Sequence, residues 1–315
     1  QVGGHRLWAH KSFKARLPLR ILLSILQAMT MNGSAYSYAR DHRTHHKNTD
    51  TDCDPKNPSR GLFYSHIGWW CLVKSQQVKD AGSKLDFSDL KDDWVVWYQH
   101  LFYKPIFVVF GIILPVAVPY YLWNEHLLVA FFVCVVFRVT TVLHHLFTVN
   151  SLAHFFGSRP YDYRIRPTEN RLVIYLSLGE GKFAHNFLLN LLFSIFYCVL
   201  GNHNYHHTFP YDYSSSEKKA WEFFNPSTLF IDFAVAIGLA YDRKKASRAV
   251  IEGTISRKGI PAHFDKPRGI CFRIFNGLCD WILGIALHVW PVAFGFAYEH
   301  FSGRTIFVYG IQAAS

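Results

Sequence analysis

Gly201–Pro210 reads GNHNYHHTFP and contains three histidines within five positions, His203, His206 and His207. The same spacing recurs in Ala39–Lys47, ARDHRTHHK, which contains His42, His45 and His46. Positions i, i+3 and i+4 of an α-helix share a face, so each copy predicts a helix that presents three imidazoles in one direction. Neutral imidazole is a good ligand for iron, copper, zinc or nickel. The two copies together predict a metal site.

Composition favours a membrane protein. Half of the 315 residues are hydrophobic and 17% are aromatic. The net charge of +11 could indicate nucleic acid, but the chain has no DNA- or RNA-binding motif. Basic cytoplasmic loops of a membrane protein explain the charge better. The six cysteines show no CxxC pair and no disulfide-like spacing, which favours a reducing environment.

Two hydrophobic segments predict a transmembrane hairpin. Pro105–Trp123 carries no charge, and Leu127–Val149 follows after the three-residue turn Asn124–His126. At about 1.5 Å per residue, each segment is long enough for a hydrocarbon core of ~30 Å. So short a turn returns the chain to its starting side. Arg138 lies inside the second segment, where a charge either faces a polar site or pairs with backbone or a buried carboxylate.

Three other segments complete the expected organisation. Leu17–Met31 is apolar but short and contains Arg20, so it predicts an interfacial helix that is partly submerged in the membrane. The polar run Asn48–Arg60 predicts a loop. Residues 225–255 are expected to include an amphipathic helix that ends in YDRKKASR.

Further histidines extend the candidate site. His5 and His10 form an HxxxxH pair, and Asn150 and His154 in NSLAH are expected on one helical face. Eight or nine imidazoles exceed the four to six ligands that one ion takes, so two neighbouring ions are predicted. No cysteine accompanies these motifs, and the Glu-x-x-His pattern of soluble di-iron bundles is missing from them. Redox-active ions with nitrogen ligands beside a membrane favour oxygen activation on an apolar substrate.

The chain resembles the membrane-bound acyl-CoA desaturases of animals, of the stearoyl-CoA (delta-9) type. The resemblance runs from about Gly4 to Glu252 and rests on HRLWAHKSFKARLPLR, ARDHRTHHK, NSLAHFFGSRPYD, NHNYHHTFPYDY and GLAYDRKKASRA. It implies an all-α membrane protein in which a transmembrane helical hairpin bears a cytosolic helical cap with three histidine boxes. The expected location is the endoplasmic reticulum membrane, with several spans and the boxes facing the cytosol.

The resemblance also implies the chemistry. In that family nine histidines, and an asparagine acting through water, bind two iron ions. The matching positions here are His5, His10, His42, His45, His46, Asn150, His154, His203, His206 and His207. Electrons are expected from NADH by way of cytochrome b5. One molecule of oxygen is then used to remove two hydrogens from a saturated acyl-CoA, which leaves a cis double bond.

Arg40 and Lys74 match family residues that contact coenzyme A, although a solvated basic face is the alternative interpretation of both. Three nearby positions depart from the family. Gly33-Ser34 replaces an Asn-Asp pair, Val73 replaces an arginine, and Phe147 replaces a tryptophan near the substrate. Nine of the 18 histidines are interpreted as packed or solvated, namely His66, His100, His126, His144, His145, His185, His263, His288 and His300.

The expected desaturase domain is 1–255, with two further transmembrane helices expected before His5. In the family Gly-Glu-Gly runs directly into the third box, but here KFAHNFLLNLLFSIFYCVLG intervenes. Removing Lys182–Gly201 restores GEGNHNYHH. We hypothesise that this insertion is a translated intron, because its ends fit splice sites: Gly-Lys-Phe can be encoded by GGTAAGTTT, and Cys-Val-Leu-Gly is compatible with an acceptor of the TTTTAG type. If it is genuine protein, a membrane crossing by Phe183–Leu200 would place the third box on the opposite side from the first two. Residues 256–315 are an atypical extension.

The alternatives to an active desaturase are a catalytically inactive fragment or mis-spliced product and, more weakly, another histidine-box enzyme such as a hydroxylase.

Overall fold

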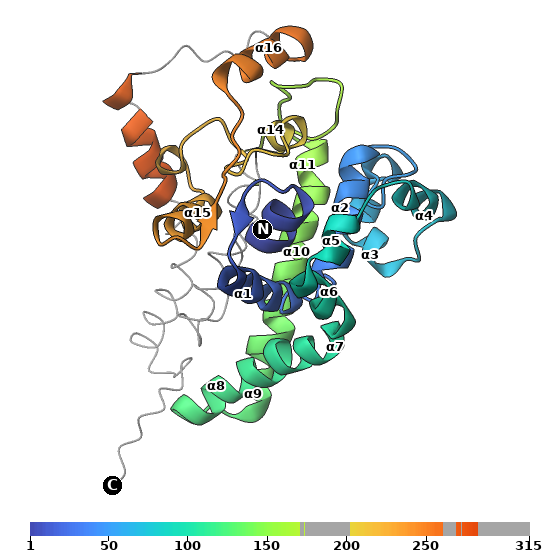
Figure 1. The fold of residues 1–315 in the computed structure, drawn as a ribbon, viewed down its shortest axis with the longest axis vertical. Helices are drawn as coiled ribbons and strands as arrows, with labels where there is room; N and C mark the ends of the chain where they lie inside the picture. The colour runs from blue at the N-terminus through green and yellow to red at the C-terminus, as the bar shows by residue number, and fades with distance from the viewer. Residues whose placement is uncertain (171–172, 174–201, 261–268, 272, 283–315) are drawn as a thin grey trace, which may run out of the picture.

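The computed structural model describes residues 1–170, 173, 202–260, 269–271 and 273–282. These residues are mainly helical (Figure 1), which confirms the expected all-α class. The one sheet found in them pairs the two-residue strands β1 (Lys14–Ala15) and β2 (Ala240–Tyr241) in antiparallel register. The insertion Lys182–Gly201 and most of the extension 256–315 lie outside the described residues.

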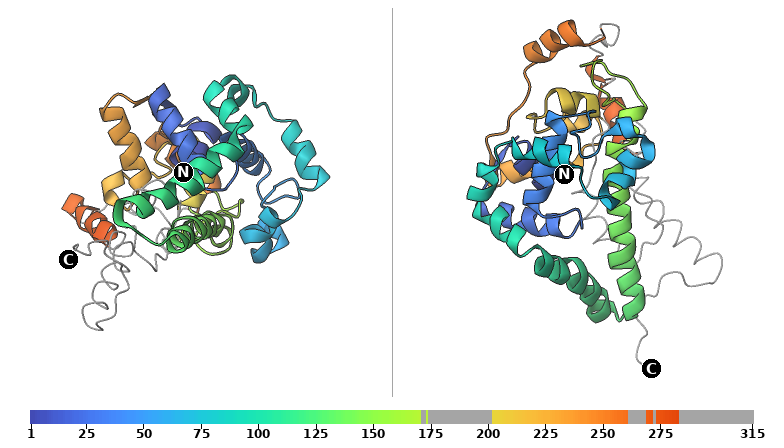
Figure 2. Two further views of the ribbon diagram at one scale, coloured as in Figure 1. Left: turned by 90° about the horizontal axis from the view of Figure 1, so that it is seen from below. Right: turned by 90° about the vertical axis from the view of Figure 1, so that its right-hand side faces the viewer.

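The two hydrophobic segments form a helical hairpin, as predicted. Its arms include Tyr103–Leu122 and Leu127–Phe155, both long and apolar enough to cross a membrane, and the first is less buried than the second. The first arm comprises α7 (Tyr103–Ile106), η4 (Phe107–Ile113) and α8 (Leu114–Trp123). The second comprises α9 (Leu127–Phe131), η5 (Phe132–Phe137), α10 (Arg138–Asn150) and α11 (Leu152–Phe155). The hairpin extends away from the remaining helices, and α10 returns to them (Figures 1 and 2).

Arg138 is buried between the two arms. Its guanidinium donates a hydrogen bond to the Gly111 carbonyl of the first arm, at 2.6 Å. The interpretation that this charge pairs with backbone is therefore confirmed. A buried arginine needs such acceptors because removing a charge from water is costly.

Three helices near the N-terminus build the main core: η1 (Val2–Ala9), α1 (Leu17–Ala28) and α2 (Ala35–Lys47). Pro18 lies in the first turn of α1, where its missing N–H costs nothing. Leu19 and Leu23 are buried, whereas Leu17 and Leu22 on the same helix are exposed. The predicted helix is thus confirmed, and its exposed apolar residues suit the membrane interface that remains a prediction.

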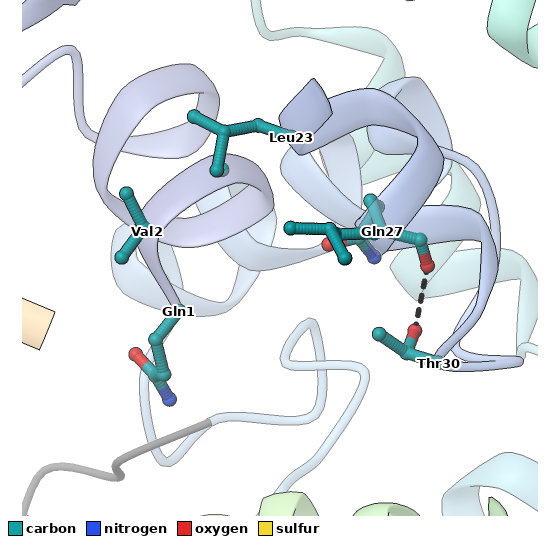
Figure 3. Close-up of a pocket in the computed structure, with 7 residues that line it drawn as sticks. Gln1, Val2, Leu23, Gln27 and Thr30 are labelled. Atoms are coloured by element: carbon teal, nitrogen blue, oxygen red, sulfur yellow. Dashed lines mark hydrogen bonds between the residues drawn. The ribbon is translucent and has the colours of Figure 1, made fainter. Parts of the chain in front are cut away.

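A small surface pocket lies between η1 and α1 (Figure 3). Its labelled lining residues are Gln1, Val2, Leu23, Gln27 and Thr30. The Thr30 hydroxyl donates a hydrogen bond to the Gln27 carbonyl at 2.8 Å. This bond lies at the end of α1 and joins two of the residues that line the pocket.

Shorter elements cover the core and connect the boxes. Before the hairpin these are η2 (Pro58–Arg60), η3 (Tyr64–Gly68), α3 (Trp69–Cys71), α4 (Gln76–Ser83), α5 (Ser88–Asp92) and α6 (Trp94–Leu101). After it come α14 (His203–Thr208), η6 (Ala220–Glu222), α15 (Pro226–Ala236) and α16 (Arg248–Lys258). The predicted loop Asn48–Arg60 is irregular apart from η2.

The prediction of a helix that ends in YDRKKASR is wrong about where the helix ends. The helix α15 ends at Ala236, and Gly238 follows with a φ of +75°, in the left-handed region that glycine adopts without strain. The chain then runs through β2 and an extended segment, where the Lys244 N–H donates to the Ser12 carbonyl at 2.8 Å. Backbone pairing with the N-terminal region therefore replaces the helix.

Part of the extension packs on the preceding domain. Residues 273–282 are helical, and Arg273 forms an ion pair with Glu222 of η6. The Trp281 indole N–H donates to the Ala220 carbonyl at 3.0 Å, and its ring lies 4.7 Å from that of Phe224. These contacts join this part of the extension to residues 220–224.

Candidate metal centre

The first histidine pair is placed by η1, a π-helix with a wide turn: His5 lies within the helix and His10 is its C-cap residue. In such a helix each N–H bonds to the carbonyl five positions earlier. The His10 N–H accordingly donates to the His5 carbonyl at 3.0 Å. One turn separates the two residues, and their ring centroids lie 4.6 Å apart. The HxxxxH spacing is therefore matched to this wider helix.

The second box lies on α2, as its spacing predicts. The Ser34 hydroxyl accepts a hydrogen bond from the Ser37 N–H at 3.1 Å and so caps the helix. The chain turns into the helix at Gly33, whose φ is +79°, a value that glycine adopts without strain. The Gly33-Ser34 pair, which departs from the resembled family, thus supplies the turn and the cap of the helix that carries His42, His45 and His46.

Arg43 holds the second box against the first pair. Its guanidinium donates two hydrogen bonds to the Asp89 carboxylate of α5, at 2.8 and 2.7 Å. It also donates to the carbonyls of Trp8 at 2.6 Å and Ala9 at 3.0 Å. Bidentate arginine–carboxylate pairs are strong and directional. Because Trp8 and Ala9 lie between the two histidines of η1, the contact fixes both motifs together.

The third box lies on the short helix α14, also as predicted, and Asn204 fixes it in place. The buried Asn204 amide accepts hydrogen bonds from the N–H groups of Tyr161 (2.8 Å) and Asp162 (3.1 Å). It donates to the carbonyls of Asp162 (2.9 Å) and Pro167 (3.0 Å). These four bonds use the full capacity of an amide, so α14 is held rigidly.

The prediction that Asn150 and His154 share one helix is wrong in detail. Ser151 has φ −107° and ψ −84°, so α10 ends at Asn150 and His154 lies on α11. The Ser151 hydroxyl donates to the Phe147 carbonyl at 2.8 Å and contacts His66 Nδ1 at 2.9 Å. Serine side chains compete in this way with helical backbone bonds.

The nine predicted histidines meet in one cluster that contains two groups. The first group is His5, His10, His42 and His206, and the second is His45, His154, His203 and His207. The nitrogens of each group lie within 4.8 Å of one another. His46 connects the groups, because its Nε2 lies 3.1 Å from that of His206 and its ring stacks on His207 at 4.1 Å.

The spacing of the nitrogens suits metal ions. The Nε2 atoms of His10 and His42 lie 2.9 Å apart, and those of His154 and His203 lie 3.0 Å apart. Two nitrogens bound at about 2.0–2.1 Å to one ion lie about 2.9–3.4 Å apart in octahedral or tetrahedral geometry. Each of the two groups therefore fits one ion with nitrogen ligands.

Burial favours the neutral form of most imidazoles in the cluster. It is the largest cause that lowers the pKa of His5, His42, His46, His203, His206 and His207, and it lowers the pKa of His10 to about 3. Neighbouring cationic groups act in the same direction. A neutral imidazole retains the lone pair that binds a metal, so the cluster is ready to act as a ligand set at neutral pH.

Two carboxylates that the sequence analysis missed orient histidines of the second group. The buried Asp54 carboxylate accepts from His45 Nδ1 at 2.8 Å, and Asp50 lies 3.4 Å from His154 Nδ1. A carboxylate at Nδ1 fixes the tautomer and leaves Nε2 for the metal. The sequence signal was the acidic run TDTDCD, which follows the second box directly but was interpreted only as a loop.

Asp54→Asn is expected to lower metal affinity at the second group by about 10- to 100-fold, because the loss of a carboxylate that orients a histidine ligand typically lowers metal affinity by that amount. Competition against a chromophoric chelator measures the change. The matched control is Asp52→Asn, on an exposed side chain two positions away. Equal affinities in the two variants would contradict the role of Asp54.

The two candidate coenzyme A residues meet at one carboxylate. Arg40 Nε donates to Asp41 Oδ1 at 3.0 Å, and the Lys74 ammonium donates to Asp41 Oδ2. Their role in binding coenzyme A stays a prediction.

Among the histidines interpreted as packed or solvated, His66 Nε2 contacts His144 Nδ1 at 3.0 Å. This pair is not part of either histidine group.

Known proteins are similar to this chain in sequence. A family model described as fatty acid desaturase matches residues 3–222. The chain is 46% identical over 262 residues to acyl-CoA desaturase 3 of Mus musculus, covering 83% of this chain and 67% of that protein. It is 46% identical over 258 residues to the stearoyl-CoA desaturase of Homo sapiens, covering 82% and 66%. Acyl-CoA desaturase 1 of Tachysurus fulvidraco is 42% identical over 262 residues, covering 83% and 72%.

The residues that the structure describes define a helical fold with two candidate membrane spans and a nine-histidine cluster built from separate sequence motifs. The chain belongs to the fatty acid desaturase family, and the resemblance in its motifs is thereby confirmed. It spans about two thirds of the length of the mammalian relatives that it matches.

Proposed function

We propose that this protein is an acyl-CoA desaturase that introduces a cis double bond into a saturated fatty acyl-CoA. It uses oxygen and electrons from NADH, delivered by cytochrome b5. The observation that carries the proposal is the convergence of eight predicted histidines into two adjacent groups, with the ninth, His46, in contact with both. Relatives named acyl-CoA and stearoyl-CoA desaturases support the substrate class.

The residues present fit a di-iron centre, in which the two histidine groups and His46 hold the metals. Two iron ions, when bound, would supply the oxygen activation that an unactivated C–H bond requires. The protein contributes rigid placement: Arg43 fixes the second box against the first pair, and Asn204 fixes the third box. Burial excludes water from the imidazoles, and Asp54 sets the tautomer of His45.

The proposed setting is the endoplasmic reticulum membrane, with the histidine boxes on the cytosolic side. The hairpin supports this arrangement because it leaves and re-enters the helical body at the same end (Figure 2). Arg40 and Lys74 are proposed to bind the coenzyme A phosphates at the cytosolic face. Basic side chains suit phosphate groups through charge-assisted hydrogen bonds.

Growth of a yeast strain that lacks its own delta-9 desaturase tests this function. The complete coding sequence is expressed with and without the codons for Lys182–Gly201, and growth is scored without added unsaturated fatty acid. We expect rescue by the form without the insertion, because it joins Gly-Glu-Gly directly to the third box. A stable protein of this form that fails to rescue growth would contradict the enzyme assignment.

The same experiment separates the alternative of an inactive or mis-spliced product. We expect the form that retains Lys182–Gly201 not to rescue growth. Sequencing of mature transcripts provides the independent check, since an intron should be absent from most of them. Rescue by the longer form, together with transcripts that always retain the codons, would show that the insertion is genuine protein.

A further inference from the structure

Lys56 lies beside the candidate metal centre, although nothing in its sequence context singles it out. It follows Asp54 in the loop between α2 and η2, and only 5% of its surface is exposed. Long cationic side chains are almost never buried this deeply without specific partners. The contacts of its ammonium therefore indicate what the residue does.

The ammonium group of Lys56 donates a hydrogen bond to Asn150 Oδ1 at 3.2 Å. It also lies 5.1 Å from the ring centre of Trp69 and 5.9 Å from that of Tyr38, within the range of cation–π attraction. The backbone N–H of Lys56 donates to Asp54 Oδ1 at 2.8 Å. One carboxylate thus anchors both Lys56 and the metal-candidate His45.

This contact fixes the orientation of the Asn150 amide. A lysine ammonium has donors and no acceptor, so the amide atom that faces it must be the oxygen. An amide oxygen has two lone pairs, and the second remains available for a water molecule on a metal. Without Lys56 the amide would be able to turn its NH₂ group to the same position.

We propose that Lys56 is a positioning residue of the metal centre, which acts by holding the Asn150 amide through its oxygen. The proposal rests on the proposed metal centre and adds to it a residue that lies outside the three boxes. It requires that Lys56 and Asn150 act as one unit, because the lysine reaches the centre through the asparagine.

A double-mutant cycle tests this requirement. The purified, chelator-stripped protein is titrated with Co²⁺, and binding is followed by the visible absorption of the bound ion. We expect two ions per wild-type chain and about 10-fold weaker binding of one of them in Lys56→Met, the size typical of lost orienting contacts. Asn150→Ala should have a similar effect, and adding Lys56→Met to it should change nothing further. Lys56→Arg should restore most of the affinity.

The control is Lys84→Met, on an exposed side chain, which should bind Co²⁺ as the wild type does. Lys56→Met would overturn the proposal if it lowered the Co²⁺ affinity equally in the wild type and in Asn150→Ala. An unchanged Co²⁺ affinity in Lys56→Met alone would also overturn it. If Lys56→Met does not fold, Lys56→Gln replaces it in the cycle. The glutamine side chain is one bond shorter than that of lysine, so it loses the contact with Asn150 Oδ1. Absence of Co²⁺ binding by the wild type would instead overturn the metal centre itself.

Discussion

Replacing His206 by alanine is expected to abolish desaturation. His206 is fully buried, and its Nε2 lies 3.1 Å from the Nε2 atoms of both His5 and His46. It therefore contacts the first histidine pair and His46, the second-box residue that connects the two groups. Loss of an orienting partner already costs 10- to 100-fold in metal affinity, so loss of a ligand at this junction should cost more than ~100-fold.

Two measurements check the His206→Ala prediction. Gas chromatography of fatty acids from the yeast strain that expresses the variant should show no unsaturated product above the background of the strain without the protein. Metal analysis of the purified variant should show that the first group is empty. His126→Ala is the control, since His126 lies in the turn between the two spans and is exposed. Normal desaturation by His206→Ala would contradict the assignment of this residue as a ligand.

Replacing Arg6 by methionine is expected to destabilise the protein more than any surface change. The Arg6 guanidinium is 1% exposed and donates to the Tyr213 carbonyl and the Thr228 hydroxyl, each at 2.9 Å. It also reaches Asn225 Oδ1, at the start of α15, at 3.4 Å. The contacts join the first histidine pair to a segment more than 200 positions away. Methionine would remove these three hydrogen bonds and leave the Tyr213 carbonyl without the guanidinium donor, at a cost of about 3 kcal/mol or more.

Thermal unfolding in detergent measures the effect of Arg6→Met. A cost of this size should lower Tm by about 5 °C or more. The control is Arg248→Met, which removes an exposed i,i+4 ion pair with Glu252 and should leave Tm nearly unchanged. A shift in Arg6→Met no larger than in this control would show that the buried guanidinium does not hold the two segments together.

Local sequence patterns were sufficient to predict the helices of the boxes and the hairpin. The HxxHH spacing of His42, His45 and His46 requires only that neighbouring residues form a helix, and α2 is such a helix. The hairpin follows from uninterrupted apolar composition, which sequence displays directly. These features depend on residues close together in the chain, where periodicity is informative.

Contacts between distant segments could not be predicted in this way. Lys56 and Asn150 are 94 positions apart, and Asp54 lies in an irregular loop without any period. At the break, the Ser151 hydroxyl bonds to the Phe147 carbonyl four positions earlier and also contacts the distant His66. The extended YDRKKASR segment is held by a backbone bond to Ser12, which overrules helical propensity. The resemblance named the nine histidines that the structure brings together, but the residues that orient them emerge only from the packed structure.

Metal analysis of the purified protein tests the central claim most directly. The protein without Lys182–Gly201 is produced from its complete coding sequence, and its iron content is measured together with the Mössbauer spectrum. We predict close to two iron ions per chain in nitrogen-rich environments, and a large loss of iron in His206→Ala. A chain that binds one iron ion or none after reconstitution, although correctly folded, would contradict the account.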